Sequence, residues 1–185
     1  MNSVRRVWPA LMLLAAGCGY NTIQTSDEQV SAALSQIKVQ LQRRGDLIPN
    51  LVATVQGYAK QERDIFTAVA DARGRLAGAI QSGDPEQMAD ANQALNAPLG
   101  RLLAIAENYP QLKSSENFRG LADELAGTEN RIAVARQDYN DAVNRYNAYI
   151  RRFPQVLTAK VIGAKSRLYF QETAGADTVP TVRFN

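Results

Sequence analysis

Apolar side chains recur every seven residues along most of the chain, in the four-and-three spacing of a helix that packs along one seam. The first such region covers residues 30–79. One column of it holds Val30, Ile37, Arg44, Leu51, Tyr58, Ile65, Ala72 and Ala79, and a second holds Leu34, Leu41, Ile48, Val55, Glu62, Val69 and Leu76. Only Arg44 and Glu62 carry a charge. The pattern predicts a first helix of about 75 Å.

Gly45 and Pro49 interrupt the helical propensity of this region. Either the helix continues with a kink at Pro49, or it ends at Gly45 and a second helix starts at a cap on Asp46, with Pro49 in its first turn. Because both columns keep their phase across the break, we favour a kinked continuous helix.

A second helix is predicted after a short loop. Asp84 supplies its N-cap, Pro85 takes the first helical position and Gln87 completes a capping box. Its seven-residue column is Met88, Leu95, Leu102 and Tyr109. Pro98 predicts a second kink, and Pro110 ends the helix.

A third helix is predicted after a cap on Ser114 or Ser115. Its column is Phe118, Leu125, Ile132, Tyr139, Tyr146 and Phe153, and all six side chains are large and apolar or aromatic. Residues 156–171 could then form a short fourth helix that Gly163 weakens. Residues 178–184 favour an extended conformation against the bundle.

The first residues have the layout of a secretory signal peptide over residues 1–17. Two arginines precede an apolar run, Val7–Ala16, which is too short to cross a membrane because a span needs about 20 residues. The sequence Leu-Ala-Ala-Gly-Cys at 14–18 resembles the lipobox of bacterial lipoproteins, which implies that Cys18 is lipidated. The other interpretations are an uncleaved signal anchor or a buried structural cysteine.

A lipidated Cys18 makes membrane lipid the first expected partner. Residues 18–26 then form a short tether and residues 27–185 the helical domain. Residue 19 is glycine and not the aspartate that commonly retains lipoproteins in the inner membrane. We therefore expect an exported protein of the cell envelope, at the periplasmic face of the outer membrane if the source has two membranes.

The composition excludes several kinds of site. The 185 residues include no histidine and one cysteine, which removes zinc and other histidine metal sites, Ser-His-Asp and Cys-His catalysis, and internal disulfides. Omitting Arg5 and Arg6 from the 21 basic residues leaves 19 against 18 acidic ones, without a basic stripe for nucleic acid. No glycine-rich phosphate loop and no Gly-x-Ser-x-Gly motif occurs. We expect no cofactor, no metal and no catalytic residue.

Polar side chains at or beside the seams are the remaining candidates. They are Arg44, Glu62, Glu107, Glu129, Asn130, Arg131, Arg136, Asn140 and Asn147. A carboxylate metal site of the di-iron type would need Glu-x-x-His pairs, so we favour a structural or interaction layer that fixes helix register. Arg43 and Arg44 are expected to pair with acids on a neighbouring helix. Since Arg44 lies on the seam, an acid should lie near it.

Several runs together resemble the LemA family of bacterial membrane-associated proteins. The most specific is Val-Gln-Leu-Gln-Arg-Arg-Gly-Asp-Leu-Ile-Pro-Asn-Leu-Val at 39–52, and others are Glu-Asn-Tyr-Pro at 107–110, Thr-Glu-Asn-Arg-Ile at 128–132 and Pro-Thr-Val-Arg-Phe at 180–184. The resemblance implies an all-α fold, an elongated four-helix up-and-down bundle tied to a membrane at its N-terminus. Gly45, Pro98 and Ala164 depart from the family pattern.

The same resemblance implies a role without catalysis. The family has no established catalytic residues, and its members often occur beside membrane metalloproteases, which would be one kind of envelope protein partner. We expect a membrane-anchored module that binds or organises other envelope proteins, and a contact at the loop of residues 81–85, at the far end of the first helix. The alternative is a structural spacer associated with the cell wall; an enzyme is disfavoured.

Overall fold

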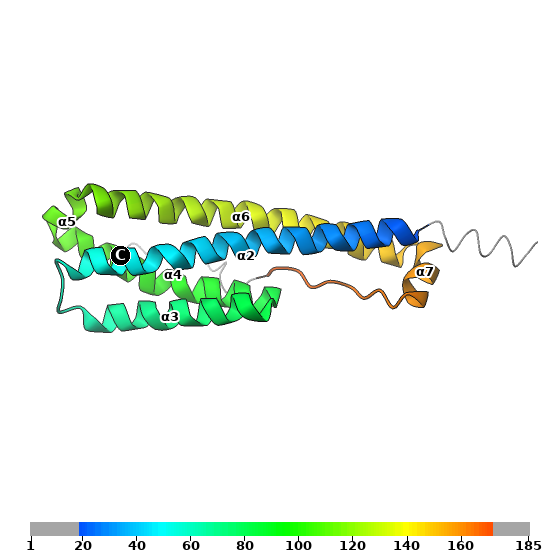
Figure 1. Ribbon diagram of the computed structural model, residues 1–185, viewed down its shortest axis with the longest axis horizontal. Coiled ribbons are helices and arrows are strands. Elements are labelled where there is room, and N and C mark those ends of the chain that lie inside the picture. Colours follow the sequence, from blue (N-terminus) through cyan, green and yellow to red (C-terminus); the bar gives the residue numbers. More distant parts are fainter. Residues whose placement is uncertain (1–18, 172–185) are drawn as a thin grey trace, which may run out of the picture. The chain divides into compact units, whose positions relative to one another are not determined.

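The computed structural model describes residues 19–171, and within this range every regular element is a helix (Figure 1). The helices are α2 (Tyr20–Gln56), α3 (Arg63–Ser82), α4 (Pro85–Asn108), α5 (Pro110–Ser114), α6 (Glu116–Arg151) and α7 (Gln155–Val161). The all-α prediction is confirmed. The predicted signal peptide, Cys18 and the extended segment at 178–184 lie outside the described residues.

The described residues form two compact units. Unit 1 combines the chain up to Ile37 with Val134–Tyr169, and unit 2 combines Lys38–Ala133 with the chain from Phe170 on. The long helices α2 and α6 each contribute one part of their length to each unit. The four-helix up-and-down arrangement and a kink in the first helix remain predictions.

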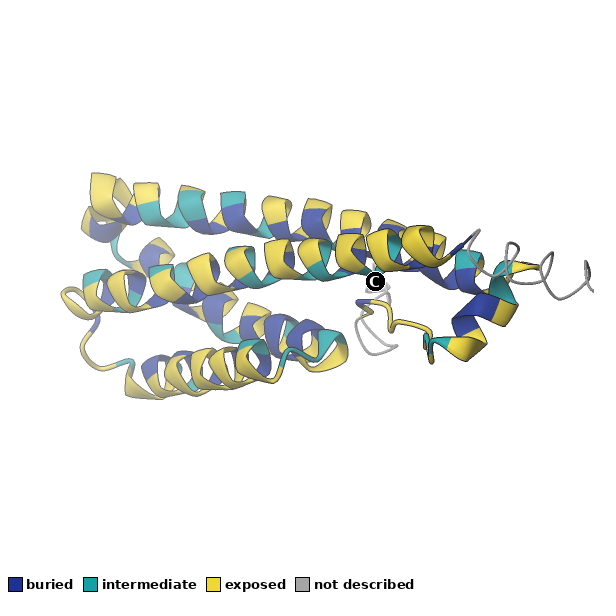
Figure 2. Ribbon diagram, turned by 45° about the vertical axis from the view of Figure 1, so that its right-hand side comes forward, coloured by how far each residue is buried: buried dark blue, intermediate teal, exposed yellow. Residues whose placement is uncertain are grey.

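Unit 2 is built from the second part of α2, the helices α3, α4 and α5, and the first part of α6. Its buried apolar positions follow the predicted columns, and Figure 2 shows them as dark stripes along the helices. They include Leu41, Ile48, Leu51, Val55, Val69, Leu76, Met88, Leu95, Leu102, Phe118, Leu125 and Ile132. The seam of each helix is therefore occupied by the unit's own core.

The prediction of one helix over residues 30–79 is wrong, although the helix does continue through Pro49. Helix α2 includes Pro49, whose ring is exposed, and ends at Gln56. A turn over residues 57–62 follows before α3 begins. The turn has almost the length of one heptad, so the apolar columns on its two sides stay in phase. Ala59 and Phe66 are buried here in place of Tyr58 and Ile65.

The connection between α3 and α4 is a tight turn at Gly83. Gly83 has φ +72°, a left-handed conformation that favours glycine, and its N–H bonds the carbonyl of Ala79. The Asp84 carboxylate then accepts hydrogen bonds from the backbone N–H groups of Glu86 and Gln87, which confirms the predicted cap. The predicted capping box does not form: the Gln87 side chain donates to the Asp84 carboxylate, and the Asp84 N–H bonds the Ser82 hydroxyl instead. Helices α3 and α4 lie side by side (Figure 1).

The loop at 81–85 is not at the far end of a 75 Å helix. Gln81 and Ser82 belong to α3, and a Cβ on Gly83 would lie 3.0 Å from the Lys38 Nζ. The turn therefore packs beside Lys38, the first residue of unit 2 on α2. At the other end of α3, the side chain of Gln61 donates a hydrogen bond to the Tyr109 hydroxyl, which ties the 57–62 turn to the end of α4.

Unit 1 is built from the first part of α2, the second part of α6, α7 and the segment that follows α7. Its core comes from the predicted columns and from residues beside them: Ile23, Val30, Ile37, Tyr139, Val143, Tyr146 and Ile150. Phe153 was expected in this seam, but α6 ends at Arg151 and Phe153 is 80% exposed. Gly163, with φ +71°, follows the end of α7, so the fourth helix is shorter than 156–171.

Candidate functional site

A buried arginine organises the polar cluster of unit 2. Arg44 occupies a core position of α2 between Ile37 and Leu51, and only 5% of its surface is exposed. Its guanidinium donates to the Asn92 side-chain oxygen and, from Nη2, to Asn96 Oδ1 at 2.7 Å. Because an unpaired charge in a core is costly, these acceptors are needed to hold it there.

Glu129 is the acid that the sequence analysis expects near Arg44. Its Oε2 lies 2.6 Å from Arg44 Nη1, so α6 joins α2 and α4 around the same guanidinium. Burial lowers the pKa of Arg44, and the negative charge of Glu129 opposes that shift. Arg44 Nε has no hydrogen-bond partner within the described residues, and the contact of Glu129 Oε2 is its ion pair with Arg44 Nη1. The guanidinium is thus held from two other helices, with one donor still unused.

A second, more exposed set of charges lies beside this cluster on α2 and α6. Glu124 Oε1 is 2.7 Å from Arg43 Nη2 and 2.9 Å from Arg131 Nη2. All three side chains are at least one third exposed, so solvent screens these pairs and they contribute little to stability. Arg43 nevertheless pairs with an acid on α6, as expected.

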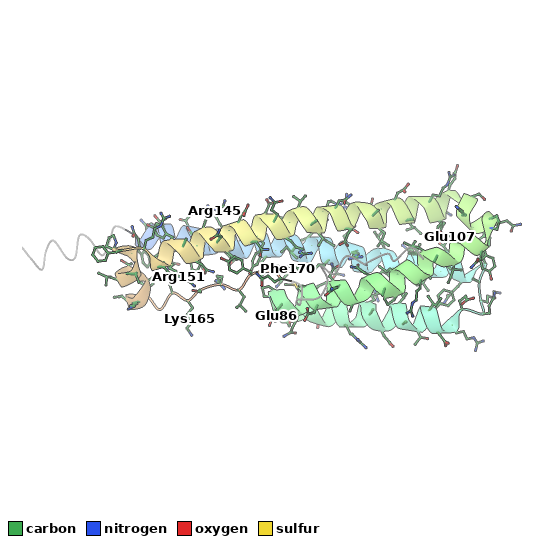
Figure 3. All side chains as sticks on the ribbon, turned by 180° about the vertical axis from the view of Figure 1, so that it is seen from behind. Glu86, Glu107, Arg145, Arg151, Lys165 and Phe170 are labelled. Atoms are coloured by element: carbon green, nitrogen blue, oxygen red, sulfur yellow. The ribbon has the colours of Figure 1, made fainter. Side chains whose placement is uncertain are left out.

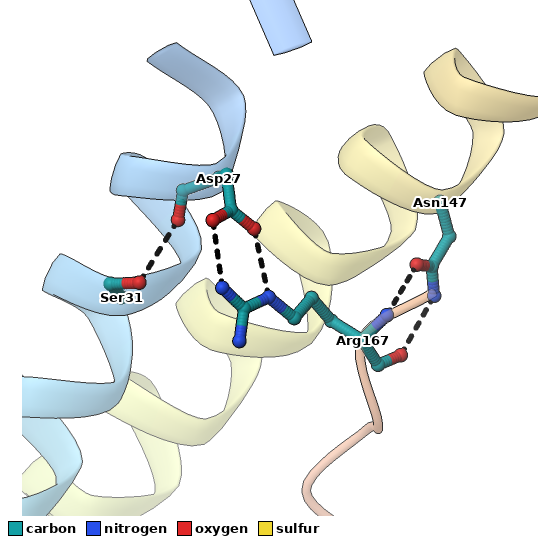
Figure 4. Close-up of polar contacts among 4 residues, drawn as sticks. All are labelled: Asp27, Ser31, Asn147 and Arg167. Atoms are coloured by element: carbon teal, nitrogen blue, oxygen red, sulfur yellow. Dashed lines mark hydrogen bonds and ion pairs between the residues drawn. The ribbon is translucent and has the colours of Figure 1, made fainter. Parts of the chain in front are cut away.

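The polar cluster of unit 1 joins α2 to the segment after α7. Arg167 donates from Nε to Asp27 Oδ1 at 2.8 Å and from Nη2 to Asp27 Oδ2 at 2.7 Å, a two-point contact between guanidinium and carboxylate (Figure 4). The Ser31 hydroxyl donates to the Asp27 carbonyl at 3.1 Å. The hydrogen bonds that Arg167 donates to Asp27 raise the pKa of Arg167.

Asn147 on α6 holds the main chain of the same residue. Its Nδ2 donates to the Arg167 carbonyl at 2.9 Å, and its Oδ1 accepts from the Arg167 N–H at 2.8 Å (Figure 4). The Tyr139 hydroxyl donates to the Leu168 carbonyl at 2.8 Å. Two core side chains of α6 therefore fix the segment 164–169, which makes no regular secondary structure of its own.

A pocket of about 350 Å³ lies beside this cluster. It is lined by the start of α2 at Ile23, Gln24 and Asp27, by Tyr146, and by residues 162–167. Burial raises the pKa of the Tyr146 hydroxyl. The negative charge of Asp27 and the hydrogen bond between Tyr146 and Asp27 also raise this pKa. The pocket contains the Asp27 carboxylate, the Arg167 guanidinium and the neutral Tyr146 hydroxyl, which already bind one another. It offers polar contacts but no activated nucleophile.

The predicted layer of polar residues is spread over several places. Arg44 and Glu129 meet in unit 2, whereas Arg136 and Asn140 lie half-buried on α6 in unit 1. Glu62 sits at the start of α3 without capping it through its side chain. Glu107 and Asn130 are exposed on α4 and α6.

Sequence reasoning missed Asn92, Asn96, Asp27 and Arg167. Asn92 had a detectable signal, because it stands four residues after Met88 on the apolar stripe of α4 and is 1% exposed. Asp27 and Arg167 are 140 residues apart in the chain and belong to no repeat, so no local pattern links them.

The described residues lack a membrane-spanning helix and a metal-binding cluster. No helix in that range is long and apolar enough to span a bilayer. The range also contains no group of three or more carboxylate or cysteine side chains placed to hold a metal ion.

The sequence of this chain is similar to those of known proteins. The model of the LemA family matches residues 33–184. Magnetosome proteins MamQ 1 and MamQ 2 of Paramagnetospirillum magneticum are each 32% identical to this chain over 184 residues, which covers 86% of this chain and 67% of the relative. Magnetosome protein MamQ of Magnetospirillum gryphiswaldense is 30% identical over 182 residues, with the same shares covered.

Proposed function

Because the chain belongs to the LemA family, we propose that it is a non-catalytic helical module, tethered to a membrane, that binds or organises other envelope proteins. This proposal is supported by the contacts of the arginine at the centre of each polar cluster. Arg44 and Arg167 are both bound by side chains of other elements, so they set the positions of helices and segments. Family membership also supports the four-helix up-and-down arrangement.

The tether is the lipid that Cys18 would carry after removal of residues 1–17. Lipidation of an N-terminal cysteine adds two or more acyl chains, which hold a protein stably where a single chain is marginal. Export with this anchor, and glycine at position 19, favour the periplasmic face of an outer membrane. Cys18→Ser should abolish incorporation of labelled palmitate. A wild-type chain that takes up no palmitate would exclude the lipid tether.

The partner is expected at the end of unit 2 formed by the 57–62 turn and the end of α4. The seams are filled by the core, so a partner must use an outer surface. Tyr58 lies in this turn and is 43% exposed, and the Gln61–Tyr109 hydrogen bond holds the turn in place. An exposed tyrosine on a fixed turn suits a protein contact because it buries much apolar area with little loss of entropy.

Site-specific photocrosslinking in native membranes tests this surface. A photoreactive residue at Tyr58 should crosslink to one defined envelope protein, and the same residue at the exposed Arg75 on α3 should not. Equal crosslinking at both positions would reject the surface. Sedimentation with cell wall, without any protein crosslink, would favour the spacer instead.

A further inference from the structure

The short helix α7 presents an exposed apolar surface. Leu157 and Val161 lie four residues apart in the helix, a spacing that puts their side chains on one side, and Phe153 lies in the turn before it, two residues ahead of Gln155. They are 80%, 56% and 87% exposed, whereas Thr158 and Ala159 are buried. We call Phe153, Leu157 and Val161 the α7 face. Grouped large apolar side chains at a surface mark an interaction site.

The α7 face lies where the predicted tether enters the fold. Figure 1 shows α7 beside the N-terminal end of α2. Gly19 is buried there, and a Cβ on it would lie 3.1 Å from Gln155 Cγ, so the first turn of α7 packs against the residue that follows Cys18. Tyr20 is 46% exposed next to it. Tyrosine is enriched at the boundary between lipid and water.

The chain around α7 is basic and contains no acid. Residues 142–171 hold Arg145, Arg151, Arg152, Lys160, Lys165 and Arg167, and no Asp or Glu. Arg152 and Lys160 are exposed neighbours of the α7 face, and Figure 3 labels Arg151 and Lys165 in the same part of unit 1. Apolar side chains flanked by Lys and Arg suit an anionic membrane, where each basic side chain raises the partition coefficient about fivefold.

We propose that the α7 face docks on the anionic lipid surface of the membrane that holds the tether. Phe153, Leu157 and Val161 enter the boundary between headgroups and acyl chains, and Arg152 and Lys160 contact lipid phosphates. This inference rests on the proposed membrane tether and adds an orientation to it. A lipid on Cys18 limits how far unit 1 can move from the bilayer but leaves its tilt free, and docking of α7 fixes the tilt.

A single tryptophan at Phe153 reports on the docking. The sequence contains one other tryptophan, Trp8 in the predicted signal peptide, so the emission of the wild-type chain is subtracted as the blank. The full-length Phe153→Trp variant, purified from membranes, is reconstituted into phosphatidylcholine vesicles with or without phosphatidylglycerol. We expect emission at shorter wavelength and quenching by brominated lipid, both stronger in the anionic vesicles. Because Phe153 is 80% exposed, its replacement should leave the helical circular dichroism unchanged.

Val134→Trp is the matched control in the same unit. Val134 is 60% exposed on α6, seventeen residues or about 26 Å before the end of that helix, and its reporter should keep the emission of water. Adding Arg152→Gln and Lys160→Gln to Phe153→Trp should weaken docking on anionic vesicles about 25-fold. A reporter at 153 that stays in water, equal shifts at 134 and 153, or docking unaffected by the two Gln replacements would each overturn the proposal.

The tether and the docking can fail separately. Palmitate labelling of the wild-type chain tests only Cys18. A labelled protein whose reporter at 153 stays in water retains the tether and loses the docking. An unlabelled protein whose reporter at 153 enters anionic vesicles loses the tether, and the docking stands on its own.

Discussion

The polar clusters of the two units are each centred on one arginine, and they differ in what surrounds it. The Arg44 side chain in unit 2 is 6% exposed and the Arg167 side chain in unit 1 is 45% exposed. Burial is the main influence on Arg44 and lowers its pKa, whereas the hydrogen bond to Asp27 dominates for Arg167 and raises its pKa. The buried charge needs its partners to compensate for lost hydration, and the exposed one does not.

This difference predicts that charge matters most in unit 2 and neutral hydrogen bonds matter most in unit 1. In unit 2, removal of Glu129 leaves a guanidinium in the core with amide oxygens alone. In unit 1, removal of Asp27 leaves Arg167 in contact with water, while Asn147 still binds the main chain. Substitutions of Glu129, Asn147 and Asp27, given below from the largest expected effect to the smallest, distinguish the buried arginine from the exposed one.

The largest effect is expected for Glu129→Leu, which should lower the free energy of unfolding by about 3 kcal/mol because it leaves a buried charge uncompensated. Arg44→Met together with Glu129→Leu should recover most of that loss, since neither charge remains. Urea denaturation followed by circular dichroism measures both. The Glu129 side chain is 42% exposed, but the oxygen that meets Arg44 is buried. If the double variant is less stable than Glu129→Leu alone, the Arg44–Glu129 pair stabilises the fold outright and the desolvation account is wrong.

An intermediate effect is expected for Asn147→Ala. It removes two hydrogen bonds from the main chain of Arg167 at a position that is 5% exposed, so the cost should be about 1–3 kcal/mol. Tyr139→Phe is the companion change, because it removes one hydrogen bond to the same segment and should cost about 1 kcal/mol. Hydrogen exchange of the Arg167 amide should accelerate more in Asn147→Ala than in Tyr139→Phe. The reverse order would place the main attachment at Leu168.

The smallest effect is expected for Asp27→Asn. The Asp27 and Arg167 side chains are 32% and 45% exposed, so the loss should stay under about 1 kcal/mol and shrink further in high salt. Denaturation at low and high ionic strength measures this. A loss as large as that of Glu129→Leu would mean that exposure does not decide the contribution of these arginines.

The apolar columns of α4 and α6 predicted these two helices. The column Phe118, Leu125, Ile132, Tyr139 and Tyr146 is buried on α6, and the Asp84 cap begins α4 as expected. The reversal at 57–62 escaped prediction because heptad phase reports spacing and not chain direction. Tyr58 fits the column as well as any core residue, yet the chain turns there and buries Ala59.

The sites were predictable only where a residue breaks a pattern. Arg44 breaks the apolar column of α2, so a buried ion pair was expected, but its acid could not be identified without the register of α6 against α2. Arg167 and Asp27 break no pattern. Asn147 was singled out as polar on the seam, but its partner is a peptide group, and every residue has one.

Asn147 recognises position 167 through main-chain atoms, so the attachment does not depend on which side chain stands there. Asn147 would therefore hold the main chain of the segment even if the side chain at 167 became shorter or neutral. A shift of the segment by one residue is another matter: it would present the wrong side chain to Asp27 and the wrong carbonyl to Tyr139. The pocket wall can therefore change its chemistry one residue at a time without losing its position on α6.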